Sequence, residues 1–362
     1  MKTFLIYFPV FVWALTLVTF VRPLPANRRI RWTWGVVLLL IAAKFVLFEH
    51  LGGNAFNPEL PVGLIWTANV LYSGLMLLAA FAVVARCCRL KGRVLWVLPL
   101  LAWGMSLRGV YNGIRVPDVR EITLAYKNLP AELNGYRIVQ LTDLHVSASA
   151  RRWRTAEIVR RANALKPDLI VCTGDIVDGH VETEAEDVAP LRDLMAPDGV
   201  YYCTGNHEYY SDAENWLQLY RDWNLRFLEN ECVFPRRMLA LGGIPDRAGA
   251  KKRLASAPDV TKAFAAATNG EFRVLLAHRP SDAENEYPRT TCDLQLSGHT
   301  HGGIMPILDW LVETYNRGYV RGLYSLGEQA KVYVSSGAGQ WSGFPIRFCD
   351  DAEIALITLR KD

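Results

Sequence analysis

Five of the seven histidines in this 362-residue chain fall in short turns that directly follow apolar stretches. Most of these turns also carry carboxylates, an amide or glycines. In chain order they are Thr142-Asp143-Leu144-His145, Gly174-Asp175-Ile176-Val177-Asp178, Gly205-Asn206-His207-Glu208, Ala277-His278 and Gly298-His299-Thr300-His301-Gly302-Gly303. A single aspartate or histidine in such a turn is usually a cap or a hydrogen-bonded core residue. Five such turns in one chain indicate instead a shared site.

The residue types in these turns are those that bind divalent cations. Carboxylates, imidazoles and one carboxamide, with no thiolate, suit borderline first-row ions such as Mn, Fe or Zn. One aspartate can bridge two ions through its two oxygens, and Asp175 is the candidate for that bridge. Two ions about 3.5–4 Å apart generate a hydroxide near neutral pH and stabilise the attacking and leaving oxygens of an in-line displacement. The chemistry expected is hydrolysis of a phosphoester.

The elements that must position these turns alternate between strand and helix from about Arg115 onward, which predicts an α/β layered domain. The apolar run before Asp175, Pro167–Cys172, predicts a buried strand. Strands are predicted at Arg137–Thr142, Leu169–Thr173, Val200–Thr204, Phe272–Ala277, Asp293–Ser297, Lys331–Ser335 and Glu353–Leu359, and helices at Trp153–Leu165, Asp187–Met195 and Asp212–Trp223. Ligands of open α/β sheets bind at the carboxyl ends of the strands, so the turns are expected to meet there.

The first 112 residues have a different composition, dominated by Leu, Val, Ala, Phe and Trp. Four apolar runs of about bilayer length predict four membrane helices, at Phe4–Val21, Trp34–Phe48, Val62–Ala85 and Val94–Gly109. No small-x-small cleavage site follows the first run, so it is expected to be retained. Lys44 interrupts the second run. It is expected to extend to the membrane interface, the alternative being the interior of the helical bundle.

The charges of the short loops predict an orientation. The second loop, His50–Pro61, has no Lys or Arg. The first and third loops are basic, through Arg22, Arg28, Arg29 and Arg31 and through Arg86, Arg89, Lys91 and Arg93. The positive-inside rule therefore places these two loops in the cytoplasm. A multi-pass protein of the inner (plasma) membrane is expected, with everything after Tyr111 on the extracytoplasmic side, although Arg108, Arg115 and Arg120 oppose that assignment.

The net charge and the cysteines are less informative. A formal charge of +4 says little about nucleic acid. Seven Cys without a CxxC pair of the metal-binding type do not form a disulfide framework. Cys172 and Cys203 lie in predicted buried strands and are expected to be inert core thiols.

The motifs Asp-x-His, Gly-Asp-x-x-Asp, Gly-Asn-His-Glu, a later His and Gly-His-x-His together resemble the calcineurin-like metallophosphoesterase superfamily, from about Leu124 to the end of the chain. Bacterial membrane-anchored members of that superfamily are the most similar. The resemblance implies a four-layer α/β/β/α sandwich with its site in the loops between the two sheets. Together with the composition of the first 112 residues, it predicts a four-helix transmembrane region, residues 1–112, and a metallophosphoesterase domain, residues 113–362.

The resemblance also implies roles for individual residues. Two divalent ions are expected, one bound by Asp143, His145 and His301 and the other by Asn206, His278 and His299, with Asp175 between them. His207 is expected to approach the substrate as a charge stabiliser or leaving-group acid, and Asp178 to orient the loop. Two positions depart from the family pattern, Ser281 where Asp is common and Ile304 where Gln is common, and neither is a ligand position.

The substrate is less well defined by the sequence. Arg151, Arg152 and Arg154, with Trp153 among them, could bind anionic headgroups or a phosphate, or could form a solvated helix start. Trp341, Phe344 and Arg347 form either a pocket wall or part of the core. With the membrane anchor, the lipid bilayer is the expected partner and a lipid or lipid-linked phosphate or pyrophosphate is the expected substrate.

Two alternatives remain. The first is a nuclease or nucleotide phosphodiesterase, since the same metal centre serves those reactions. A domain outside the cytoplasm disfavours nucleic acid, which is therefore not expected as a partner. The second is a membrane sensor or scaffold with a retained but inactive site. All seven expected ligands are present in the sequence, and this favours catalysis.

Overall fold

The computed structural model describes residues 2–268, 270–281, 292–303, 309–327, 330–348 and 351–362. They form two compact units. The helical unit comprises Met1–Ile114 and Ser342–Arg347, and the sheet unit comprises Arg115–Trp341 and Phe348–Asp362. The histidine-bearing turns all belong to the sheet unit. Ile304, one of the two departures from the family pattern, lies outside the described residues.

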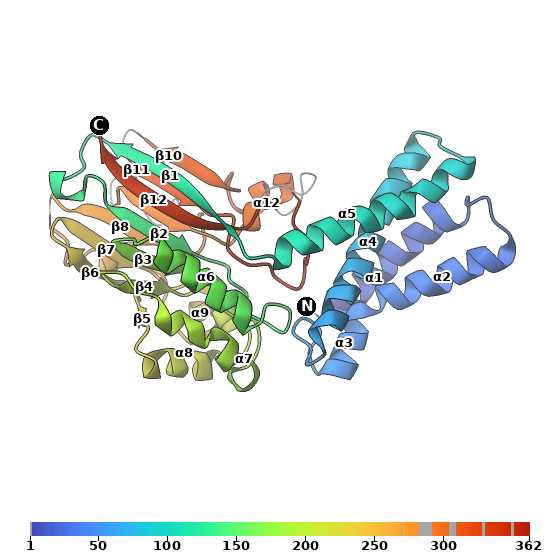
Figure 1. Ribbon diagram of the computed structural model, residues 1–362, viewed down its shortest axis with the longest axis horizontal. Coiled ribbons are helices and arrows are strands. Elements are labelled where there is room, and N and C mark those ends of the chain that lie inside the picture. Colours follow the sequence, from blue (N-terminus) through green and yellow to red (C-terminus); the bar gives the residue numbers. More distant parts are fainter. Residues whose placement is uncertain (1, 269, 282–291, 304–308, 328–329, 349–350) are drawn as a thin grey trace. The chain divides into compact units, whose positions relative to one another are not determined.

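The sheet unit contains two six-stranded sheets, in the order β1-β12-β2-β3-β4-β5 and β10-β11-β9-β8-β7-β6 (Figure 1). The first is built from β1 (Asp118–Tyr126), β2 (Arg137–Leu141), β3 (Leu169–Thr173), β4 (Val200–Cys203), β5 (Arg226–Phe227) and β12 (Glu353–Lys361). The second is built from β6 (Glu231–Arg236), β7 (Leu239–Gly243), β8 (Phe272–Leu276), β9 (Leu294–Ser297), β10 (Gly322–Leu326) and β11 (Ala330–Val334). Strands β2 to β5 are parallel, as are β7, β8, β9 and β11, so within each group the carboxyl ends share one edge.

Alternate residues of the central strands face two different cores. In β3, Leu169 and Val171 pack between the sheets with Val274 of β8 and Leu294 of β9. The intervening residues of β3 contact the helices on the outer face, where Trp216 belongs to the same cluster. A strand buried on both faces is apolar throughout, as the sequence of β3 predicts. The seven predicted strands are confirmed, with bounds that differ by no more than two residues.

Helices cover the outer face of each sheet, which completes the four layers predicted. The first sheet is covered by α6 (Arg152–Ala164), α7 (Val181–Val188) and α8 (Ala213–Asp222) (Figure 1). The second sheet packs against α10 (Val260–Ala263), and the unit also holds α9 (Arg247–Lys252) and α12 (Asp309–Tyr315). Short 3₁₀ turns lie at Ala131–Leu133, Ala189–Asp193, His207–Tyr209 and His301–Gly303.

The predicted helix Asp187–Met195 is wrong in its position. The structure has α7 ending at Val188 and a 3₁₀ turn over Ala189–Asp193. Pro190 is the reason, because proline has no N–H for a helical hydrogen bond and its ring clashes with the preceding turn. Pro190 therefore disfavours an α-helix through residue 190, and the segment forms a 3₁₀ turn instead.

The helical unit contains α1 (Lys2–Thr16), a π-helical turn (Leu17–Val21), α2 (Arg28–Ala42), α3 (Lys44–Gly52), α4 (Val62–Cys87), a 3₁₀ turn (Gly92–Trp96) and α5 (Val97–Ile114). Among the described residues, Val62–Cys87 and Gly92–Ile114 are long and apolar enough to cross a membrane. The pair α2 and α3, bent by 52°, meets the same test when taken as one span, and Tyr7–Val21 is a shorter apolar helix. The predicted count of four spans is therefore not confirmed.

Lys44 does not extend to an interface, so that prediction is wrong. Its side chain is only 4% exposed, at the bend between α2 and α3. The ammonium nitrogen lies 4.6 Å from the ring centroid of Phe45 and 5.3 Å from those of Phe48 and Tyr72. It has no hydrogen-bond partner among the described atoms. Three aromatic faces stabilise the charge only in part, since cation–π contacts do not replace hydration fully.

Replacing this lysine by an apolar residue of similar length is expected to stabilise the protein. Lys44→Met removes a buried cation that has no hydrogen-bond partner among the described atoms. Replacing even a paired buried charge by an apolar residue of similar volume is often neutral or stabilising, by about 1–4 kcal/mol. The thermal midpoint of the full-length protein in detergent micelles measures the effect, with the exposed Lys91→Met as control. A lower midpoint for Lys44→Met alone would show that the ammonium has a stabilising partner.

The expectation for the two core thiols is confirmed. Cys172 and Cys203 are 1% and 0% exposed. Burial in apolar surroundings raises the pKa of both thiols. The reactive thiolate is therefore suppressed at physiological pH.

Candidate metal centre

The carboxyl ends of strands from both sheets bring the predicted ligands together. In the first sheet, Asp143 follows β2, Asp175 follows β3 and Asn206 follows β4. In the second sheet, His278 follows β8 and His299 follows β9. Such ends of parallel strands are where α/β proteins place ligand sites.

One group of candidate ligand atoms comes from Asp143, His145 and His301, which lie within 4.8 Å of one another. The Nε2 atoms of the two histidines are 3.1 Å apart. His301 Nε2 is 3.5 Å from Asp143 Oδ1. These are the three residues expected to bind the first ion.

A second group comes from Asp175, His278 and His299. Asp175 Oδ2 lies 3.1 Å from His278 Nε2, and that nitrogen lies 3.2 Å from His299 Nδ1. The same carboxylate oxygen is 3.8 Å from Nε2 of His145 in the first group. Asp175 therefore lies between the two groups, where a bridging ligand would be required.

Asn206, the remaining predicted ligand, is buried beside the second group. Its Oδ1 atom and His299 Nε2 accept hydrogen bonds from the same guanidinium, that of Arg279, at 2.9 and 2.8 Å. The structure thus brings all seven predicted ligands to one place.

Two of the histidines are held so that one ring nitrogen faces the centre. His278 Nδ1 donates to the carbonyl oxygen of Thr173 at 2.8 Å. His145 Nδ1 lies 3.0 Å from Asp178 Oδ2. A proton on Nδ1 leaves the lone pair on Nε2, and such outer partners commonly fix the tautomer of a metal-binding histidine.

His207 lies at the edge of the centre. Its Nδ1 is 2.5 Å from Asp178 Oδ1, and its backbone N–H donates to Asp175 Oδ1 at 2.8 Å. Burial favours the neutral imidazole, but Asp178 and Asp175 outweigh burial and raise the pKa of His207 to about 9. The ring centroid is 5.0 Å from Tyr210 and 5.7 Å from Trp341. His207 thus holds a proton beside two aromatic rings.

The backbone at the centre is strained. Five of the predicted ligands have positive φ angles, which residues other than Gly rarely adopt. They are Asp143 (51°), His145 (44°), Asp175 (52°), His299 (73°) and His301 (50°). Each such residue costs about 1–3 kcal/mol. This clustering is typical of functional sites, because the surrounding fold must hold the strain.

Residue 205 must be glycine because its backbone lies very close to Asp175. A Cβ there would lie 2.2 Å from Asp175 Oδ1 and 2.5 Å from the Asp175 backbone nitrogen. Gly205→Ala is therefore expected to displace the central carboxylate and to lower both metal content and turnover, by about 10–100-fold in turnover, as for other losses of ligand positioning. Gly104→Ala is the control, since no atom lies within 4 Å of its added Cβ. Unchanged metal content and turnover in Gly205→Ala would contradict this account.

The buried carboxylates create a need for positive charge. Burial and the neighbouring Asp175 raise the pKa of Asp143. Burial alone would also raise the pKa of Asp175, but His278, His207 and His145 hold it well below its usual range. Divalent cations would supply the missing charge directly. The donor set of carboxylates, imidazole nitrogens facing one another and an amide oxygen fits such ions chemically.

Three arginines were predicted to contact the substrate. The structure contradicts that prediction for one of them, and the other two form ion pairs with acidic side chains. Arg154 is 2% exposed and donates to the carbonyl oxygens of Ala338 and Arg115. A side chain used in this way is not available to a phosphate, so that prediction is wrong. Arg151 and Arg152 lie against acidic side chains of α7, Asp187 and Glu186, at 3.2 and 3.4 Å. Their role as substrate contacts remains a prediction.

The sequence left open whether Trp341, Phe344 and Arg347 form a pocket wall or part of the core, and the structure gives different answers for different residues. Trp341 lies beside His207, at the centre. Phe344 and Arg347 belong to the helical unit, where Arg347 is fully buried and its backbone N–H donates to Gly109. Core packing is therefore confirmed for Arg347.

Two functional candidates were not predicted from the sequence. The carboxylate of Glu208 is fully buried and accepts backbone N–H groups of Asp175, Ile176 and Gly205 at 3.0, 2.6 and 2.6 Å. It joins the two turns that carry Asp175 and Asn206. The position of Glu208 inside the motif Gly-Asn-His-Glu could have indicated this role.

Arg279 is the second candidate that the sequence analysis missed. Its only indication in the sequence is its position directly after His278.

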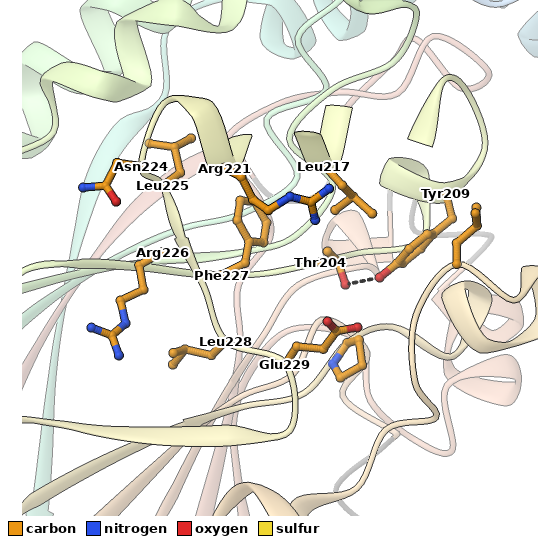
Figure 2. Close-up of a pocket in the computed structure, with 12 residues that line it drawn as sticks. Thr204, Tyr209, Leu217, Arg221, Asn224, Leu225, Arg226, Phe227, Leu228 and Glu229 are labelled. Atoms are coloured by element: carbon orange, nitrogen blue, oxygen red, sulfur yellow. Dashed lines mark hydrogen bonds between the residues drawn. The ribbon is translucent and has the colours of Figure 1, made fainter. Parts of the chain in front are cut away.

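The sheet unit contains a cavity of about 510 Å³ (Figure 2). Its lining includes Thr204 and Tyr209, whose hydroxyls are 2.9 Å apart, with Leu217 and Phe227 among its apolar walls. None of the predicted ligands lines it.

Comparison with known proteins agrees with this geometry. The model of the calcineurin-like phosphoesterase family matches residues 136–303. An uncharacterized metallophosphoesterase of Helicobacter pylori is 37% identical over 71% of this chain and 67% of its own length. A transmembrane protein with metallophosphoesterase domain from Danio rerio is 34% identical over 71% of this chain and 60% of its own length. A dimetal phosphatase from Danio rerio superposes with a TM-score of 0.36 at 12% identity, over 57% of this chain and 88% of that one, too distant to add to the assignment.

The chain belongs to the calcineurin-like metallophosphoesterase family. It is accordingly a metal-dependent phosphoesterase, a hydrolase acting on ester bonds. The apolar helices and the transmembrane relative make it a membrane-associated member.

Proposed function

We propose that this protein is a membrane-anchored phosphohydrolase with a binuclear metal centre, acting on a lipid or lipid-linked phosphate. The observation that carries the proposal is the convergence of two ligand groups on Asp175, which belongs to the second group and lies 3.8 Å from His145 of the first. A single ion would not need ligands on both sides of one carboxylate.

In this proposal Asp143, His145 and His301 would hold one ion, and Asn206, His278 and His299 would hold the other. Asp175 would serve both. The donors suit Mn, Fe or Zn. Two such ions supply Lewis acidity and an activated water to the phosphoryl group.

The residues around the ions then have separate tasks. His207 stabilises charge on the substrate or gives its proton to the leaving oxygen, in keeping with a proton held beside Asp178 at 2.5 Å. Asp178 is a positioning residue, because its two oxygens face His145 and His207. It fixes one ligand and one proton donor relative to each other.

A lipid-linked substrate is supported by the apolar helices, which are long and apolar enough to cross a membrane and belong to the same chain as the sheet unit. The aromatic rings of Trp341 and Tyr210 beside His207 supply an apolar rim for a substrate with an apolar part.

The test is hydrolysis by the purified full-length protein, loaded separately with Mn, Fe or Zn. The substrates are phosphatidic acid, a polyprenyl pyrophosphate, a nucleoside diphosphate, a cyclic dinucleotide and single-stranded DNA. Selective release of phosphate from the two lipids is the expected result. Preference for the nucleotides or DNA would favour the phosphodiesterase alternative, and no hydrolysis under any condition would favour the non-catalytic sensor.

The side of the membrane is a separate prediction. The two basic loops flanking His50–Pro61 predict, by the positive-inside rule, that the sheet unit lies outside the cytoplasm. Alkaline phosphatase, which is active only outside the cytoplasm, is therefore expected to give signal when fused after Asp362 and none when fused after Arg89. The reverse pattern would place the sheet unit in the cytoplasm and make nucleotides or nucleotide-linked lipid precursors the better substrates.

A further inference from the structure

Arg279 places a permanent positive charge against the second ligand group. One terminal nitrogen of its guanidinium donates to Asn206 Oδ1 and the other to His299 Nε2. The side chain is 17% exposed, so solvent reaches it. An arginine remains charged at any pH at which the protein is folded.

A buried carboxylate fixes the position of this guanidinium. Arg279 Nε donates to Asp246 Oδ2 at 2.6 Å. The Asp246 side chain is fully buried, and its other oxygen accepts the backbone N–H of Ala248 at 2.8 Å. Asp246 is therefore a positioning residue for Arg279, anchored itself by the start of α9.

The contact between Arg279 and His299 is incompatible with an ion bound to His299. A neutral imidazole has a single lone pair, and Arg279 uses the one on Nε2. An ion at Nε2 would take that lone pair. An ion at Nδ1 would leave the ring proton on Nε2, facing the N–H of Arg279. In both cases one guanidinium N–H loses its acceptor.

The other contacts of Arg279 survive ion binding. The Asn206 oxygen has two lone pairs, so it can accept from Arg279 and bind an ion at the same time. The bond to Asp246 involves no predicted ligand. The guanidinium thus stays at the edge of the centre, held by Asp246 and Asn206, while the Nη1 donor that faces His299 is released.

We propose that Arg279 binds a non-bridging phosphoryl oxygen of the substrate, and that occupation of His299 by an ion makes it available to do so. This inference rests on the proposed function and adds a substrate-binding residue to it. The guanidinium fork matches the geometry of phosphate oxygens and gives charge-assisted hydrogen bonds. The second ion and the arginine would then act on the same phosphoryl group.

The test measures binding rather than turnover alone. Calorimetry gives the affinity of the full-length protein for Mn²⁺, and then the affinity of the Mn²⁺-loaded protein for inorganic phosphate. The variants are Arg279→Gln, which removes the charge, and Arg279→Lys, which keeps the charge without the fork. Arg236→Gln is the matched control, because Arg236 Nε lies 2.8 Å from a carboxylate oxygen, that of Asp198, in a pair that contains no predicted ligand. Thermal midpoints establish that each variant is folded.

Arg279→Gln is expected to weaken phosphate binding by about 10–100-fold, the usual contribution of a charge-assisted contact, while Mn²⁺ binds as tightly as before or more tightly. Arg279→Lys is expected to restore part of the phosphate affinity, and Arg236→Gln to leave it unchanged. Weaker Mn²⁺ binding with normal phosphate affinity in Arg279→Gln would overturn the inference, because a residue that only supports Asn206 would act in that way. Wild-type protein that binds phosphate but cleaves no ester would contradict the proposed function and leave this inference standing.

Discussion

Asp175→Asn is expected to lose more than about 100-fold in hydrolysis of a chromogenic phosphodiester, and to bind fewer ions per chain, because the central negative charge is what balances both ions. The side chain lies within 3.8 Å of histidine nitrogens from both ligand groups. The measurement is turnover together with metal content of the purified protein.

Asp222→Asn is the control for this change. Asp222 is an exposed aspartate at the end of α8 whose carboxylate accepts a hydrogen bond from Gln218. It should leave both quantities unchanged. Near-normal turnover with two bound ions in Asp175→Asn would refute the bridging role.

His207→Ala is expected to slow esters with poor leaving groups by about 100–10,000-fold, the usual range for a lost proton donor, and to slow good leaving groups much less. A donated proton matters most when the departing alkoxide is basic. Turnover across a series of aryl and alkyl phosphoesters measures the dependence.

Metal content separates this effect from damage to the centre. His207 contacts Asp175 through its backbone N–H, and that bond is retained in the alanine variant. Both ions should therefore stay bound. An equal loss across the whole series would assign His207 to charge stabilisation or positioning instead of proton donation.

The fold of the sheet unit could be predicted where burial leaves a clear pattern. Leu169–Thr173 is apolar along its length because both of its faces are covered, and its bounds were predicted without error. Two of the strands missed from the sequence have weaker patterns: Arg226–Phe227 is only two residues long, and Gly322–Leu326 has no fully buried residue. Local signals of this kind cannot define a strand whose stability comes from its neighbours.

The sequence predicts that the five turns meet, but it does not predict the surroundings of the candidate centre. One such turn is usually a cap or a core residue, so Asp143 and His278 were predicted to share a site only because five such turns occur together. The sequence could not show that Arg154 is buried against carbonyl oxygens or that Arg279 lies on Asn206. Both arginines are defined by contacts with residues distant in the chain. Lys44 was misplaced for the same reason, since its aromatic neighbours include one from another helix, Tyr72.

The central claim is that two ions, held by two groups sharing Asp175, carry out the reaction. Stripping the full-length protein of metal and titrating it with Mn²⁺, while bound ions and phosphodiester turnover are measured together, tests this claim directly. Full turnover is expected only when two ions are bound per chain. Full turnover with one ion bound, or turnover that persists in the stripped protein under chelator, would contradict it.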